Sequence, residues 1–188
     1  TKGHSERVME YAEGMGSELK LSKEKIKMIK FGALLHDIGK IGISGDIIRK
    51  PAQLTEAEYE IIKQHPIIGD QILSGIDFLK DAREIVRYHH ERLDGKGYPY
   101  KLNGDGIPIE VRILHIADVY DALSSERPYR KAMSSEKSLE IMIKDVGTHF
   151  DFNVLKAFVN YLKKKNILSD NYVIPEKSSM PEEFKEVP

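Results

Sequence analysis

The chain has 188 residues, of which 40% are hydrophobic and 31% are charged, and its formal net charge is −1. Its length and composition are those of one globular domain, and the balanced charge excludes the basic surface that duplex nucleic acid requires. Because the chain has no cysteine, disulfides, thiolate catalysis and zinc–thiolate sites are excluded, and a metal site must use histidines and carboxylates. No apolar run has membrane-spanning length and no signal peptide opens the chain, which predicts a cytoplasmic domain without membrane contact.

Apolar residues recur at helical spacing along most of the chain, and we find no convincing alternating strand pattern. Ser22 is a predicted helix cap, and Thr55 with Glu58 forms a predicted capping box. The expected helices cover residues 3–16, 22–37, 55–65, 67–75, 79–90, 109–124, 136–146 and 153–165. We expect the third of them to end at His65, because Pro66 follows. The fold class is therefore an all-α bundle of about seven or eight helices.

Two segments interrupt or follow this pattern. Residues 91–108 are rich in glycine and proline and must form a long loop, which in a compact domain is often functional. Residues 169–188 contain three prolines and are expected to be a C-terminal tail or linker, so the folded domain is predicted to cover residues 1–168. The chain begins with Thr1 and a helical pattern starts almost at once, which indicates a piece of a longer protein.

Five expected helices carry histidine or aspartate on their apolar faces or where those faces end. These residues are His4, His36, Asp37, His65, His89, His90 and Asp118. One such histidine would ordinarily be a hydrogen-bonded core residue, but helices that share one core bring all seven side chains together. Burying this many ionisable groups without a cation is costly. The set exceeds one tetrahedral site, so we expect two metal ions bridged by a water and by Asp37.

The motifs that contain these residues resemble a known family. HDIGK (36–40), HHE (89–91) and DGKGYP (94–99) resemble the HD-GYP family of the HD phosphohydrolase superfamily, and RILHIADVYDAL (112–123) and RPYR (127–130) match it further. The resemblance extends from His4 to Lys165. It implies the HD-domain helical bundle with a Gly/Pro-rich GYP loop.

The resemblance also implies a function. HD-GYP proteins are bacterial metal-dependent phosphodiesterases that hydrolyse cyclic di-GMP to the linear dinucleotide pGpG, and often on to GMP, with two or three ions that are usually iron or manganese. The family's metal ligands fall on the seven residues above. Its catalytic and phosphate-contacting residues match Asp37, Lys40, Arg127 and Arg130. Members with three metals carry a glutamate one helical turn before the first histidine, a position that would precede Thr1.

The resemblance implies partners as well. The GYP loop, with Tyr98, is expected to shape the entrance for the substrate, and in some members this loop contacts diguanylate cyclase domains. A sensory or receiver domain is expected in the parent protein. The alternative for the loop is a turn that only shapes the rim of the site.

The sequence allows two roles for each of several polar residues. Lys40 contacts a phosphoryl oxygen or is a solvated lysine at a helix end. Arg127 and Arg130 bind phosphate or guanine edges, or form surface ion pairs. We expect Glu91 or Asp94 to orient an imidazole N–H, and Asp121 either does the same or faces a neighbouring helix. His115 and His149 match no ligand position of the family.

Three other functions compete with cyclic di-GMP hydrolysis. The first is hydrolysis of another nucleotide phosphodiester, such as a hybrid cyclic dinucleotide. The second is a nucleotide-sensing or partner-binding module with little turnover. The third, a purely structural bundle, leaves the buried carboxylates unexplained.

Overall fold

The computed structural model describes residues 3–126 and 131–175, and in these ranges all named elements are helices. The longer α-helices are α1 (His4–Glu18), α2 (Lys23–Leu35), α4 (Glu56–Ile62), α5 (His65–Leu73), α6 (Lys80–Tyr88), α7 (Ile109–Ser124), α8 (Ser135–Ile143) and α9 (Phe152–Lys164). One short α-helix, α3 (Gly45–Ile48), and the 3-10 helices η1 (Ile38–Gly42), η2 (Asp77–Leu79) and η3 (Gly104–Gly106) lie between them. The longer helices correspond one to one with those expected, so the predicted all-α bundle is confirmed.

The structure confirms the two helix starts that were predicted from a capping residue. The Ser22 side chain accepts a hydrogen bond from the Lys25 amide, and Thr55 and Glu58 form the reciprocal capping box. Two predicted helix ends are wrong. α2 ends before His36, and His65 begins α5 instead of ending α4. Pro66 lies in the first turn of α5, where a proline has no intrahelical amide bond to lose.

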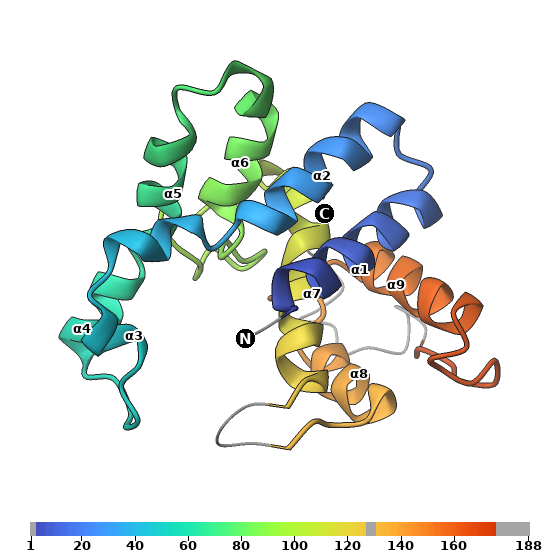
Figure 1. Ribbon diagram of the computed structural model, residues 1–188. Coiled ribbons are helices and arrows are strands. Elements are labelled where there is room, and N and C mark those ends of the chain that lie inside the picture. The colour runs from blue at the N-terminus through green and yellow to red at the C-terminus, as the bar shows by residue number, and fades with distance from the viewer. Residues whose placement is uncertain (1–2, 127–130, 176–188) are drawn as a thin grey trace.

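α7 lies in the middle of the bundle (Figure 1), where it packs against α1, α2, α6, α8 and α9. Its buried residues contribute to the main core. A smaller core cluster joins α5 and α6 to α2 and is formed by Leu73, Leu79, Ala82 and Val86. α1, α2 and α6 all pack on α7, and α5 packs on α6. His4 at the start of α1 and His36 just after α2 both lie within 4.0 Å of Asp118, so these helix ends meet beside the middle of α7.

The backbone of η1 lies directly on α5. A Cβ atom at Gly39 would lie 1.9 Å from the carbonyl oxygen of His65 and 2.5 Å from the amide nitrogen of Gly69. Only glycine permits this approach without a backbone shift. The contact brings Asp37, at the start of η1, next to His65.

The chain beyond α9 continues along the domain. Tyr172 and Ile174 belong to the segment expected to be a tail, and both pack against the main core. The rest of that segment, residues 176–188, lies outside the described residues, so the boundary at residue 168 stays a prediction. Among the helices of the described ranges, none combines the length and the apolar character needed to cross a bilayer.

Candidate metal centre

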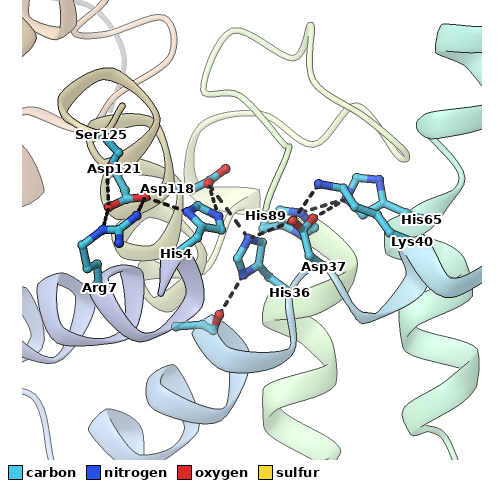
Figure 2. Close-up of polar contacts among 11 residues, drawn as sticks. His4, Arg7, His36, Asp37, Lys40, His65, His89, Asp118, Asp121 and Ser125 are labelled. Carbon is cyan, nitrogen blue, oxygen red and sulfur yellow. Dashed lines mark hydrogen bonds and ion pairs between the residues drawn. The ribbon is translucent and has the colours of Figure 1, made fainter. Parts of the chain in front are cut away.

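The seven side chains predicted to bind metal come together where the helix ends meet α7; Figure 2 shows all of them except His90. They form two groups around a central aspartate. The groups are His4, His36 and Asp118, and His65, His89 and His90. Within each group, one nitrogen or oxygen atom from every residue lies within 4.8 Å of the others.

Asp37 lies between the two groups and directs a different oxygen to each. Its Oδ1 atom is 3.5 Å from Nε2 of His65, and its Oδ2 atom is 3.7 Å from Nε2 of His36. Asp118 completes the first group, with Oδ1 at 3.3 Å from Nε2 of His4. Asp37 would therefore be able to contact a cation held by either group.

Three of the histidines are oriented by the same backbone contact. Nδ1 of His36, His65 and His89 donates to the carbonyl oxygens of Ala33, Ile62 and Val86, at 2.7, 2.7 and 2.8 Å. Each acceptor lies three residues earlier in the last turn of a helix, where carbonyls have no amide partner within the helix. The bond fixes a proton on Nδ1, so Nε2 is the atom of each ring that can offer a lone pair to the centre.

These lone pairs are placed for a cation. Nε2 of His65 lies 3.2 Å from Nε2 of His89, and both residues are buried. Burial lowers the pKa of both imidazoles, that of His89 to about 3, so protons do not hold the two nitrogens together. A metal ion that accepts both lone pairs fits this arrangement.

The carboxylates of the centre are ionised. Burial by itself would raise the pKa of Asp37, but the neighbouring His36 and Lys40 lower it below its ordinary value. Burial by itself would also raise the pKa of Asp118. The hydrogen bond from His4 and the neighbouring imidazoles outweigh burial and hold this pKa well below its ordinary value. Ionised carboxylates and neutral imidazoles are the states that bind a divalent cation. Before a metal ion binds, His4 is protonated, because its contacts with Asp118 and Asp121 raise its pKa to about 9. A metal ion would therefore displace the proton on its Nε2 atom.

His4 is oriented by a carboxylate. Its Nδ1 atom donates to Oδ2 of Asp121 at 2.7 Å. Asp121 is fully buried and also accepts from Arg7 and Ser125. Burial would raise the pKa of Asp121, but the bonds from His4 and Arg7 lower it to about 2. Of the two roles considered for Asp121, the structure shows the first, orientation of an imidazole.

The expectation that Glu91 or Asp94 orients an imidazole is wrong. The Glu91 carboxylate accepts from the amides of Tyr100 and Leu102, at 2.7 and 2.9 Å. The Asp94 carboxylate accepts from Arg92 and from the Lys96 amide. Both acids brace the loop that follows them, because helix carbonyls already supply the acceptors that these acids were expected to provide. No sequence signal marked those carbonyls.

Two of the four residues expected to contact the substrate, Lys40 and Tyr98, lie within the described part of the chain. Nζ of Lys40 lies 2.6 Å from Oδ2 of Asp37, at the edge of the centre, and its side chain is 41% exposed. The Tyr98 ring stacks on the His90 ring, with centroids 4.7 Å apart. Arg127 and Arg130 lie outside the described residues. His115 donates to the backbone oxygen of Glu91, and it belongs to neither group of candidate ligands.

Comparisons with known proteins identify the family of this chain. The HD domain family matches residues 1–154. The chain is 42% identical over 172 residues to 3'3'-cGAMP-specific phosphodiesterase 3 of Vibrio cholerae, covering 92% of this chain and 37% of the relative. It is 40% identical over 174 residues to a cyclic di-GMP phosphodiesterase of Thermotoga maritima, covering 92% of this chain and 46% of the relative. The chain thus spans less than half the length of either relative.

A solved structure shows the same fold. The structure of an HDG"Y"P protein from Bdellovibrio bacteriovorus superimposes with a TM-score of 0.68 at 21% identity, over 85% of this chain and 51% of that chain. At this identity the match supports the fold alone. Together with the family match and the motifs around the centre, it shows that this chain belongs to the HD-domain family, in its HD-GYP group.

Proposed function

We propose that this domain is a metal-dependent phosphodiesterase that hydrolyses cyclic di-GMP to pGpG, and then to GMP. The observation that carries the proposal is the pair of His/Asp groups on either side of Asp37. The relatives named above, a cyclic di-GMP phosphodiesterase and a 3'3'-cGAMP phosphodiesterase, support it.

The donor set fits at least two divalent cations. His4, His36 and Asp118 would hold one, His65, His89 and His90 would hold another, and Asp37 would contact both. When bound, such cations acidify a water molecule and neutralise charge on the phosphoryl oxygens. A set rich in imidazole and without thiolate favours iron or manganese over magnesium.

Lys40 is the described cation best placed for the phosphate. Its ammonium lies beside Asp37 at the edge of the centre, and its side chain is partly exposed. We assign it to a phosphoryl oxygen, because an ammonium on a flexible stem acts as a point charge. Arg127 and Arg130 complete the proposed phosphate contacts, as the family motif implies. The sensory or receiver domain and the contact of the GYP loop with a diguanylate cyclase stay predictions.

A hybrid cyclic dinucleotide is the second candidate substrate. The 42% identity to a 3'3'-cGAMP-specific enzyme favours it. The two substrates share the phosphodiester and differ in one base, so the metal centre would treat them alike. The choice between them depends on contacts with the base.

The test is a parallel assay on protein purified anaerobically and loaded with Fe²⁺ or Mn²⁺. Cyclic di-GMP, 3'3'-cGAMP and pGpG are supplied separately, and products are separated by chromatography. We expect metal-dependent conversion of cyclic di-GMP to pGpG and then GMP. Faster turnover of 3'3'-cGAMP would favour the second substrate, and loaded protein that hydrolyses none of the three would contradict the proposed activity.

A further inference from the structure

His90 differs from the other histidines of the centre in how its ring is held. Nδ1 of each of the other four donates to a fixed acceptor, which is Asp121 or a helix carbonyl. Within residues 3–126 and 131–175, no group is hydrogen-bonded to a ring nitrogen of His90. The Tyr98 ring lies against it instead, at 26° between the planes and 4.7 Å between the centroids.

The loop that carries Tyr98 is pressed onto the segment that carries His90. The Tyr98 amide donates to the carbonyl oxygen of His90 at 3.2 Å. A Cβ atom at Gly97 would lie 2.5 to 2.6 Å from backbone atoms of His90, Glu91 and Arg92. The backbone contact therefore determines where the Tyr98 ring can lie.

Glu91 fixes the other end of the same loop. Its carboxylate is buried and accepts from the amides of Tyr100 and Leu102. Two charge-assisted bonds to backbone amides hold a loop more tightly than neutral bonds would. The loop is thus anchored both before and after Tyr98, at Gly97 and at the amides of Tyr100 and Leu102.

We propose that Tyr98 is a positioning residue for the metal centre, and that its stacked ring orients His90 for metal binding. The inference rests on the proposed function, because it requires the ion. Outer partners of a ligating histidine fix the orientation of its ring, and here an aromatic ring takes the place of the hydrogen-bond acceptor. The resemblance implied that Tyr98 shapes the substrate entrance, but one face of its ring is occupied by His90.

The test compares three variants for Mn²⁺ affinity, measured by titrating metal-free protein and recording free Mn²⁺ by electron paramagnetic resonance. Tyr98→Leu removes the ring and should weaken one Mn²⁺ site by about tenfold or more. Tyr98→Phe keeps the stack and should bind Mn²⁺ as the wild type does. Tyr100→Leu is the matched control, because Tyr100 lies in the same loop and its ring contacts Tyr88.

The outcomes separate this inference from the proposed function. Wild-type protein that binds no Mn²⁺ would contradict the metal centre itself. If the wild type binds Mn²⁺ and Tyr98→Leu binds it equally well while KM for cyclic di-GMP rises, Tyr98 is a substrate contact and the inference is wrong. Loss of affinity in Tyr98→Phe would also overturn it, because the hydroxyl and not the ring would then be responsible.

A fourth variant covers the case in which Tyr98→Leu does not fold, as judged by circular dichroism. Glu91→Gln places an amide N–H₂ against a backbone N–H and loosens the loop while the Tyr98 ring stays in the chain. This variant should weaken the same Mn²⁺ site. Unchanged Mn²⁺ affinity in Glu91→Gln would overturn the inference.

Discussion

Nε2 of His65 lies 3.2 Å from Nε2 of His89, while a helix carbonyl holds the proton of each ring on Nδ1. Two lone pairs that face each other in a buried site repel. A divalent cation that binds both converts this repulsion into attraction. Metal binding should therefore stabilise the folded chain as well as support the proposed chemistry.

Metal removal should lower the Tm, and added Mn²⁺ should raise it progressively. An ion that binds only the folded state adds about 2.7 kcal/mol to the free energy of unfolding at a hundredfold excess over its Kd. Differential scanning calorimetry of chelator-treated protein across a Mn²⁺ series checks this. Mg²⁺ at equal concentrations should have a smaller effect, because it prefers oxygen donors. A Tm that does not respond to Mn²⁺ would contradict the metal centre.

Asp37→Ala should abolish turnover and lower the amount of bound metal together. This carboxylate is the residue that faces both groups of donors, so both proposed ions lose a ligand. Elemental analysis and a cyclic di-GMP assay on one preparation measure the two effects. Asp46→Ala, at an exposed position in α3, is the control and should change neither. Full activity in Asp37→Ala would show that the site is wrongly assigned.

Lys40→Ala should lower the rate by roughly a hundredfold, the loss typical of removing one preorganised donor to a developing negative charge. The metal content should stay near that of the wild type, because the ammonium contacts Asp37 and takes no place among the donors. Steady-state kinetics with elemental analysis distinguish the two effects. Lys30→Ala, which removes a lysine of similar exposure paired with Glu13, is the control. A large loss of metal in Lys40→Ala would contradict the proposed role.

Asp121→Asn should weaken metal binding about tenfold, because its amide cannot accept from both His4 and Arg7 as the carboxylate does. The free energy of unfolding should fall by about 2 kcal/mol, the usual contribution of a hydrogen bond to a charged group. A Mn²⁺ titration and urea unfolding measure the two effects. Ser125→Ala removes only one donor to the same carboxylate and should have a smaller effect on both. Equal effects of the two variants would argue against orientation of His4 by Asp121.

Gly39→Ala should destabilise the fold by about 1–3 kcal/mol, the usual cost of overpacking. The new Cβ would overlap backbone atoms of His65 and Gly69, which cannot rotate away as a side chain can. Gly75→Ala is the matched control, because a Cβ there has no neighbour within 4 Å, and it should change stability by less than about 0.5 kcal/mol. Urea unfolding of both variants gives the comparison, and similar stabilities would show that η1 can move off α5.

Helical periodicity predicted most of the longer helices, because they bury an apolar stripe that is visible in the local sequence. The exception is α4, which has no buried residue and whose start was predicted from the capping box of Thr55 and Glu58. The errors lie at helix ends. Pro66 is compatible with stopping one helix and with starting the next, and the structure uses the second option. Likewise, Glu91 had the charge expected of a residue that orients an imidazole, but its carboxylate binds loop amides.

The sequence by itself determined the chemical inventory of the site. The sequence contains no thiol, and its histidines and aspartates follow the apolar faces of the expected helices. Its HD-GYP motifs indicate the family. The sequence also suggested Asp37 as the central ligand. Only the tertiary structure decided which residues form the group on each side of Asp37, that Asp121 orients His4, and that Tyr98 stacks on His90. The physical reason is that these distances depend on which helix ends meet. Close backbone contacts, such as that of Gly39 with α5, determine which helix ends lie together, and they join residues that are far apart in the chain.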